Sequence, residues 1–211
     1  MTGFKRIFDI FFSIFVLILT SPLFLAIAIA IKTTSKGPIF YKSLRVKKGF
    51  KLFHCIKFRT MYLDADTRLS EMIQTDPKIA AEWNTYLKLK NDPRVTPVGK
   101  WLRRTSLDEL PQFFHVLTGQ LSVVGPRPYA VMGDPKNYKQ EIRNYLQGDC
   151  DAILSIKPGI TGLWQTSGRN HLPLSNRVHL DVVYIAKQSL LLDLILILKT
   201  IPTMIFARGA F

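Results

Sequence analysis

The chain has 211 residues, enough for one domain with a hydrophobic core and too few for two full domains. Lysine and arginine number 29 against 15 acidic residues, and the net charge of +14 indicates an anionic partner such as nucleic acid, lipid headgroups or a phosphorylated substrate. Cys55 and Cys150 lack metal-ligand spacing, which favours reduced thiols packed in a core over a disulfide framework.

The first predicted element is an almost wholly apolar stretch, residues 10–31. About 20 apolar residues span a bilayer as one straight helix, so this stretch is long enough to enter a membrane. The main alternative is a cleaved signal peptide, since basic residues precede the stretch and Ala28-Ile29-Ala30 resembles a cleavage site. Signal peptides have apolar cores of roughly 7–15 residues, so the greater length favours a retained membrane element.

The flanks and the middle of this stretch indicate how it enters the membrane. Basic residues lie at both ends, namely Lys5, Arg6, Lys32 and Lys36. Because basic residues favour the cytoplasmic side, both ends are predicted on the same face. Pro22 removes a backbone donor near the middle, and the hydroxyl of Ser21 can bond a freed carbonyl. The sequence therefore favours a re-entrant helix hairpin broken at Ser21 and Pro22 over a kinked transmembrane helix.

Charged residues precede the first apolar stretch and interrupt a second one. Asp9 follows Lys5 by four residues, so we expect either a pair of these side chains at headgroup level or a solvated helix cap. A second apolar stretch, residues 190–206, contains Asp193 and Lys199 as well as Pro202. Spanning would place those charges in hydrocarbon, so we expect an interfacial or packed helix there.

The segments between these stretches are mostly short and helical. Two extended segments, residues 39–41 and 52–60, are predicted around a basic turn at residues 47–49. Apolar periodicity predicts helices from Asp76-Pro77 to about residue 90, over residues 138–148 and over residues 174–185. No alternating strand–helix series is present, so we expect a mainly α fold with a few short β-strands, of the α+β class.

The first candidate catalytic residues are an adjacent acidic pair, Asp108 and Glu109. An ordinary capping box with Ser106 as the cap is the simplest alternative. Pro111 would then fall fifth in the helix and lose a hydrogen bond, whereas with Asp108 at or near the cap it falls where backbone donors are unpaired anyway. We therefore predict that the acidic pair lies at a helix N-terminus.

A carboxylate at that position is suited to phosphate chemistry. The positive end of the helix and the neighbouring Arg103 and Arg104 favour its ionised form and attract phosphate. An ionised Asp108 can attack phosphorus, and Glu109 can hold Mg²⁺, which would neutralise a diphosphate.

Further basic side chains are predicted near this pair. Alternation in the second extended segment places Lys57 and Arg59 on one face, either toward substrate or toward solvent. Arg127 and Arg169 lie in turns rich in glycine or proline, and a planar guanidinium suits phosphate oxygens. A lone arginine in a turn is more often solvated, so the interpretation depends on the whole set.

Five motifs, together with Ser21-Pro22, carry a resemblance to a known family. They are Lys57-Phe58-Arg59-Thr60-Met61, Ser106-Leu107-Asp108-Glu109-Leu110-Pro111-Gln112, Gly125-Pro126-Arg127-Pro128, Lys157-Pro158-Gly159-Ile160-Thr161-Gly162 and Gly168-Arg169-Asn170. In this order they resemble the small monotopic polyprenyl-phosphate phosphoglycosyl transferases, or bacterial sugar transferases. Residues 62–102 and the last four residues are similar to the catalytic part of undecaprenyl-phosphate galactose phosphotransferases. Those enzymes usually have extra N-terminal membrane helices, which we do not expect in this chain.

The resemblance implies an architecture and a cellular location. We expect a re-entrant membrane helix over residues 1–36 and a catalytic domain over residues 37–211 with an interfacial C-terminal helix at 189–206. The interfacial amphipathic helices would surround a small cytosolic globular core. The protein would lie in the bacterial inner membrane with its active site on the cytoplasmic face.

The resemblance also implies ping-pong chemistry. Asp108 would take a hexose-1-phosphate from a UDP-sugar as a covalent intermediate and release UMP, and undecaprenyl phosphate would then attack that intermediate. Asp108 and Glu109 would bind Mg²⁺ and transfer protons, while Arg103, Arg127 and Arg169 would contact phosphate or nucleotide. The expected partners are UDP-sugar, undecaprenyl phosphate and membrane lipid without nucleic acid, and a homodimer is left open.

Two other functions compete with this one. The acidic triplet Asp64-Ala65-Asp66 is compatible with a membrane-tethered, metal-dependent glycosyltransferase that releases UDP, although it also fits the start of a helix. A tethered protein that binds anionic lipid without turnover is the other alternative. The four histidines show neither triad nor zinc spacing, which argues against hydrolase and zinc chemistry.

Overall fold

The computed structural model describes residues 2–86, 89–168 and 174–205. Over these ranges the chain is mainly helical with strands in two small sheets, which confirms the predicted α+β class. The elements in chain order are α1 (Thr2–Leu19), α2 (Ser21–Thr34), β1 (Phe40–Lys47), the 3₁₀ turn η1 (Lys48–Phe50), β2 (Lys51–Phe58), α3 (Ala65–Thr75), α4 (Pro77–Tyr86), α5 (Pro97–Thr105), the 3₁₀ turn η2 (Leu107–Glu109), α6 (Gln112–Leu117), β3 (Ser122–Val124), β4 (Tyr129–Ala130), α7 (Tyr138–Leu146), the 3₁₀ turn η3 (Gln147–Asp149), α8 (Cys150–Ile153), β5 (Gly159–Thr161), α9 (Leu163–Ser167), α10 (Leu174–Lys187) and α11 (Leu190–Ile205).

The N-terminal stretch forms two helices that break where the sequence predicts. Pro22 lies in the first turn of α2, where its missing N–H leaves no hydrogen bond unmade. The hydroxyl of Ser21 donates to the carbonyl of Ile18 at 2.8 Å, and that of Thr20 donates to the carbonyl of Val16 at 2.7 Å. These two hydroxyls satisfy carbonyls at the C-terminal end of α1, which confirms the predicted break at Ser21 and Pro22.

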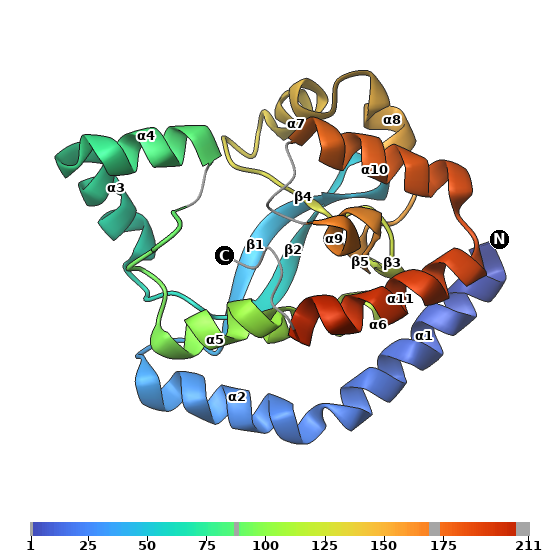
Figure 1. Cartoon of the computed structure of the whole chain (residues 1–211), viewed down its shortest axis with the longest axis horizontal. Coiled ribbons are helices and arrows are strands. Elements are labelled where there is room, and N and C mark those ends of the chain that lie inside the picture. The colour runs from blue at the N-terminus through green and yellow to red at the C-terminus, as the bar shows by residue number, and fades with distance from the viewer. Residues whose placement is uncertain (1, 87–88, 169–173, 206–211) are drawn as a thin grey trace.

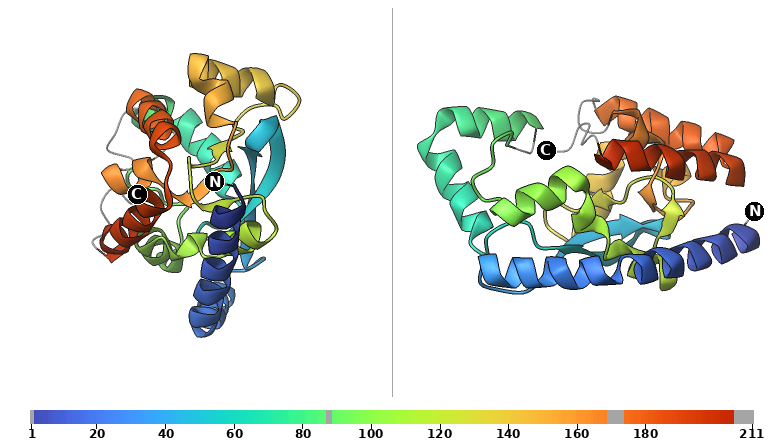
Figure 2. Two further views of the ribbon diagram at one scale, coloured as in Figure 1. Left: turned by 90° about the vertical axis from the view of Figure 1, so that its right-hand side faces the viewer. Right: turned by 60° about the horizontal axis from the view of Figure 1, so that its bottom comes forward.

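The two helices extend along one side of the molecule, and the later elements lie on the other side of this pair (Figures 1 and 2). Among the described residues, no single helix is long and apolar enough to cross a membrane. Helices α1 and α2 meet that requirement of length and composition only together, with a bend of 60° between them. Large apolar side chains are exposed along both, at Phe4, Ile7, Phe11, Phe15, Ile18, Leu19, Leu25 and Ile29.

The main sheet is an antiparallel hairpin of β1 and β2 with the short β4 on the free edge of β1. Its register pairs Phe40 with Phe58 at one end and Lys47 with Lys51 at the other, around the predicted basic turn. Directly opposed residues in an antiparallel pair point to the same face. Tyr41 is therefore beside Lys57, at the end of the sheet where the site is formed.

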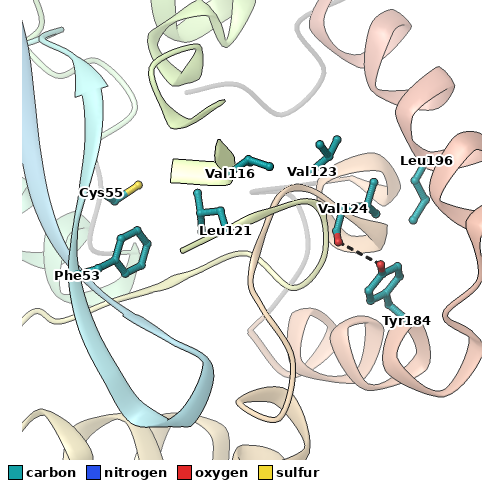
Figure 3. Close-up of a cluster of buried hydrophobic side chains, with 8 residues drawn as sticks. All are labelled: Phe53, Cys55, Val116, Leu121, Val123, Val124, Tyr184 and Leu196. Carbon is teal, nitrogen blue, oxygen red and sulfur yellow. Dashed lines mark hydrogen bonds between the residues drawn. The ribbon is translucent and has the colours of Figure 1, made fainter. Parts of the chain in front are cut away.

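The hydrophobic core fills the space between this hairpin and the C-terminal helices (Figure 3). Its buried residues come from β2, α6, β3, α10 and α11, and from the turn before β3, and they are Phe53, Cys55, Val116, Leu121, Val123, Val124, Tyr184 and Leu196. The hydroxyl of Tyr184 donates to the carbonyl of Val124 at 3.1 Å, so one buried polar group also links α10 to β3. Cys55 and Cys150 are both free and buried, as the sequence predicts.

The polar residues of α1 and α11 pair differently from the predicted arrangement. Asp9 does not bond Lys5 and is not a solvated cap: it is 3% exposed and accepts hydrogen bonds from the Ser122 hydroxyl at 2.8 Å and the Val123 amide at 3.2 Å. Lys5 instead forms an ion pair with Asp193, which is buried in α11. In the folded chain α1 packs against β3, so each of the two charged side chains finds a partner far away in the sequence in place of a pair within α1.

Helix α11 is packed on one side, as expected for the second apolar stretch. Its Asp193 and Leu196 are buried, whereas Leu191 and Leu198 are exposed. Helices α3 and α4 form a hairpin that projects away from the sheet (Figure 1).

Candidate active site

The acidic pair lies in the 3₁₀ turn η2, between α5 and α6. Ser106 ends α5 in a left-handed conformation, with φ of 56°, and α6 begins at Gln112. Asp108 and Glu109 therefore lie in the first turn of a 3₁₀ helix capped by Ser106, so the predicted helix N-terminus is a 3₁₀ turn just before α6 and not the start of an α-helix. The left-handed Ser106 turns the chain sharply, and Pro111 directly precedes the short α6.

Glu109 is held by two cations from other parts of the chain. Its Oε1 accepts from Lys57 Nζ of β2 at 2.6 Å and from Arg127 NH2 at 2.6 Å, and its Oε2 accepts from Arg127 NH1 at 3.1 Å. Burial alone raises the pKa of Glu109, but Arg127 and Lys57 together hold that pKa well below its ordinary value. Glu109 is therefore a fixed negative charge that orients Lys57 and Arg127.

Asp108 has a different environment although it is the adjacent residue. It is 7% exposed, and Lys57 Nζ lies 3.6 Å from its Oδ2, beyond hydrogen-bonding distance. Burial raises the pKa of Asp108, and the charge of Glu109 adds to the rise against the opposing charges of Lys57 and Arg103. The expected stabilisation of the ionised form by a helix end and arginines is thus wrong in its net direction, because enclosure of the carboxyl outweighs the cations.

Arg103 approaches the pair from the last turn of α5. Its Nε donates to the Thr60 hydroxyl at 3.0 Å, and the charge of Asp108 acts on it. Tyr41 lies across the hairpin from Lys57 and is 57% exposed, so its ring is available at the edge of the cluster.

Arg127 lies in the loop between β3 and β4, at a crossing with β5 that only glycine allows. A β-carbon on Gly159 would lie 2.0 Å from the amide nitrogen of Gly125. The close approach lets Gly159 N donate to Pro126 O at 2.8 Å and Gly125 N donate to Thr161 O at 2.9 Å. The glycines of two of the sequence motifs therefore fix the base of the loop that carries Arg127.

Of the other predicted basic residues, Arg59 is not part of this cluster. Arg59 is buried and donates to the backbone carbonyls of Ser35, Lys36 and Pro38 at 3.0, 2.7 and 2.7 Å. It thus holds the chain that follows α2, and neither of the expected surroundings, substrate or solvent, is found. Arg169 lies outside the described residues.

Sequence reasoning did not single out two arginines that contact the Arg127 loop. Arg45 donates to the Pro128 carbonyl at 2.6 Å, and Arg177 donates to the Arg127 carbonyl at 2.9 Å. The alternation of β1 places Arg45 on the face of Tyr41 and hence of Lys57, which was the available signal for Arg45. Arg177 carries no comparable signal, because helical spacing does not show which loop a helix contacts.

The acidic pair is also the candidate site for a divalent metal. Within residues 2–86, 89–168 and 174–205, no group of three or more histidine, cysteine or acidic side chains is placed to hold an ion. Two carboxylates nevertheless fit Mg²⁺, which is commonly bound by one or two carboxylates and completed by substrate phosphates. Of the two, Asp108 makes the weaker contacts with cations, since both oxygens of Glu109 are already hydrogen-bonded.

Together these side chains form a set suited to a phosphorylated substrate. Lys57, Arg103 and Arg127 supply three positive charges around two carboxylates, and their donors match phosphate oxygens. The arrangement combines one carboxylate that is fixed by ion pairs with one that is enclosed and less tightly bound.

The sequence is similar to those of known proteins over nearly its whole length. The family described as bacterial sugar transferase matches residues 1–207. The chain is 42% identical to the exopolysaccharide production protein ExoY of Sinorhizobium fredii, over 98% of this chain and 88% of that protein. It is 44% identical to the undecaprenyl-phosphate galactose phosphotransferase of Salmonella typhimurium, over 98% of this chain and 41% of that protein.

A third relative is the UDP-glucose:undecaprenyl-phosphate glucose-1-phosphate transferase of Klebsiella pneumoniae, 43% identical over 94% of this chain and 39% of that protein. The chain thus spans most of ExoY and about two fifths of the two named phosphotransferases. With the family match extending over nearly the whole sequence, the chain belongs to the bacterial sugar transferase family.

Proposed function

We propose that the protein transfers a hexose-1-phosphate from a UDP-sugar to undecaprenyl phosphate, giving undecaprenyl-diphosphate-sugar and UMP. The names of the Salmonella and Klebsiella relatives support the carrier and the class of group transferred. The observation that carries the proposal is the asymmetric acidic pair, in which Glu109 is fixed by Lys57 and Arg127 while Asp108 is enclosed without a direct hydrogen bond to them. Such a reaction would be the first membrane step in assembling a polysaccharide or other glycan.

In the proposed first half-reaction, an Asp108 carboxylate oxygen attacks the phosphorus that carries the sugar. A bond forms between that oxygen and phosphorus, the bond from phosphorus to the bridging oxygen breaks, and UMP leaves with the bridging oxygen. Lys57, Arg103 and Arg127 lie around this position and stabilise the phosphate charges. In the second half-reaction, a phosphate oxygen of undecaprenyl phosphate attacks the same phosphorus and releases the Asp108 carboxylate.

We further propose that Asp108 and Glu109 hold Mg²⁺ together with the donor diphosphate. The chemistry that it supplies is neutralisation of the diphosphate charge, which reduces repulsion against an anionic nucleophile. The diphosphate oxygens would share Lys57 and Arg127 with Glu109, so that Glu109 could serve as a ligand while it stays beside both cations.

We also propose that α1 and α2 form a re-entrant hairpin in the cytoplasmic leaflet of the bacterial inner membrane. The 60° bend, the exposed apolar side chains and the basic residues at both ends of the pair support this placement. Exposed apolar residues of α11 would lie at the same membrane surface. The active site would then face the cytoplasm, where UDP-sugars are found.

One assay tests the reaction and its intermediate. Purified protein is incubated with Mg²⁺, undecaprenyl phosphate and a panel of UDP-sugars, and released nucleotide is identified. We expect UMP from the parent and none above background from Asp108→Asn, while Asp151→Asn, which changes an exposed carboxylate on α8, keeps full turnover. Without the acceptor, the intact mass of the parent should rise by one hexose phosphate.

Other outcomes would favour the competing functions. Full turnover by Asp108→Asn would contradict the proposed intermediate. Release of UDP would favour a glycosyltransferase that uses Asp64 and Asp66, although Asp64 is exposed and bonds Arg68 at 2.8 Å. Lipid binding without release of any nucleotide would favour a non-catalytic tether.

A further inference from the structure

The side chain of Arg127 can reach Glu109 only if its backbone is held in place, and that backbone lies in a loop. The loop connects β3 to β4 and consists of Gly125, Pro126, Arg127 and Pro128. The glycine crossing with β5 fixes its first half through the Gly125 amide and the Pro126 carbonyl. The carbonyls of Arg127 and Pro128, in its second half, require other donors because buried carbonyls rarely remain unpaired.

Two guanidinium groups supply those donors, one to each consecutive carbonyl. Arg177 of α10 donates from NH2 to the Arg127 carbonyl at 2.9 Å. Arg45 of β1 donates from NH1 to the Pro128 carbonyl at 2.6 Å, and its Nε donates to the Ser43 hydroxyl at 3.1 Å. The loop is therefore held from the sheet and from a C-terminal helix at the same time.

Arg177 is itself fixed by two aromatic rings. Its guanidinium carbon lies 3.9 Å from the centroid of the Tyr129 ring and 5.1 Å from that of Trp164. The hydroxyl of Tyr129 donates at 2.6 Å to Asp181, which follows Arg177 by one turn of α10. The same helix thus holds Tyr129 by its ring face and by its hydroxyl.

Arg177 and the side chain of Arg127 also share one aromatic neighbour, Trp164. The guanidinium of Arg127 lies 5.9 Å from the centroid of the Trp164 ring, the same ring that Arg177 approaches. A planar guanidinium can stack and donate at once, which an ammonium group cannot do.

The arrangement brings like charges together, and this argues for a function beyond satisfying two carbonyls. Arg45, Arg127 and Arg177 are close enough that their charges act on one another, since burial and then Arg127 lower the pKa of Arg45. A neutral donor would satisfy the carbonyls without that repulsion. Three guanidinium groups instead leave the surroundings of Glu109 positively charged and ready for an anion.

We propose that Arg45 and Arg177 are positioning residues that hold the Arg127 loop so that the Arg127 guanidinium meets both Glu109 and the diphosphate of the donor. The inference rests on the proposed function for the identity of the donor, and on geometry alone for the action of both arginines through Arg127. It predicts that substitutions at position 177 act only while Arg127 is present.

A double-mutant cycle measures this dependence. We expect Arg177→Met to lower kcat/KM for the UDP-sugar by about 10- to 100-fold in the parent, as misplacement of a catalytic group by about 1 Å does. In an Arg127→Gln background the same change should have an effect of less than about threefold, because the group that it positions is gone. Equal factors in the two backgrounds would overturn the proposal.

Two further variants separate positioning from charge and from general stacking. Arg177→Lys keeps the positive charge and loses the planar group, so we expect a loss of kcat/KM close to that of Arg177→Met. Full activity in Arg177→Lys would mean that charge alone matters and would reject the clamp. Arg143→Met is the matched control, since exposed Arg143 stacks on Phe50 at 5.2 Å without contacting the loop.

Hydrogen exchange provides a readout that does not depend on turnover. In the purified protein in detergent, amides within residues 122–131 should exchange faster in Arg177→Met and Arg177→Lys than in the parent or Arg143→Met. Unchanged exchange in both position-177 variants would contradict the clamp. If the parent releases no UMP from any UDP-sugar, the proposed function fails, while this exchange measurement still decides whether Arg177 holds the loop.

Discussion

At the residue scale, Asp108 and Glu109 share a turn but differ in their relation to charge. Glu109 bonds Lys57 and Arg127 directly, whereas Asp108 is enclosed and lies 3.6 Å from Lys57. Their pKa values accordingly move in opposite directions, upward for Asp108 and downward for Glu109. Removing the two charges should therefore change the stability of the protein with opposite signs.

We predict that Asp108→Asn raises the melting temperature at pH 7 while it abolishes transfer. The pKa of Asp108 is higher in the folded protein than its unfolded value of 3.8. The folded state therefore loses stability as the pH rises from 3.8 through the folded pKa and the carboxyl ionises. The amide removes that penalty, and each 1 kcal/mol gained shifts the melting temperature by roughly 2–4 °C in a chain of this size. Thermal unfolding in detergent at pH 7 and near pH 4 checks this, and the gain should shrink at the lower pH.

We predict that Glu109→Gln destabilises the protein at neutral pH. The depressed pKa of Glu109 means that its contribution is present above the unfolded pKa of 4.5 and is lost as pH falls through the folded pKa. Neutralising it leaves Lys57 and Arg127 without their carboxylate, and breaking a buried pair costs about 3 kcal/mol. The same unfolding measurement applies, and a melting temperature at or above that of the parent would contradict the assigned role of Glu109.

At the scale of elements, the first turns of α1 hold segments that lie next to the site. Arg6 donates to the carbonyls of Val116 and Leu117 at the end of α6, and Asp9 accepts from Ser122 and Val123 of β3. Helix α6 follows the acidic pair, and β3 precedes the Arg127 loop. The N-terminal helix thus holds both of the segments that adjoin the site.

We predict that Asp9→Ala lowers the free energy of unfolding by about 1–3 kcal/mol, because the buried Ser122 hydroxyl and Val123 amide both lose their acceptor. Chemical denaturation in detergent measures the change. Asp66→Ala, which removes an exposed carboxylate of α3, should stay within about 0.5 kcal/mol of the parent. Equal effects of the two substitutions would show that the buried contacts of Asp9 contribute nothing.

Local patterns predicted the elements well and their partners poorly. Apolar periodicity located α4, α7 and α10, and Ser21 and Pro22 located the break between α1 and α2, because both signals act within a few residues. Asp9 was misassigned because Ser122 lies 113 residues away and no spacing rule reaches that far.

The same limit explains the errors within the site. Motif order identified Lys57, Arg127 and the acidic pair, and the structure brings them together. The direction of the Asp108 pKa depends on enclosure by the folded chain, which the sequence does not display. Arg59 was expected to face either substrate or solvent, but its guanidinium donates to three backbone carbonyls of the segment that follows α2.

At the scale of the whole molecule, the bent pair of α1 and α2 makes the membrane topology testable. We predict that cysteines introduced as Gly3→Cys and Lys36→Cys, both at exposed positions, are protected from a membrane-impermeant thiol reagent in intact spheroplasts and labelled after permeabilisation. Native Cys55 and Cys150 are buried and give little background. Labelling of only one of the two positions in intact spheroplasts would show that the pair crosses the bilayer.

The crossing of Gly125 and Gly159 has a consequence for engineering donor preference. A β-carbon on Gly125 would lie 2.7 Å from the Lys157 carbonyl oxygen, and one on Gly159 would lie closer still to backbone, so randomised libraries should retain only glycine at both positions. Altered selectivity is then expected from replacements of Tyr41, which is exposed beside Lys57. The glycine crossing would keep the Arg127 loop unchanged while the exposed tyrosine is varied to accept another sugar.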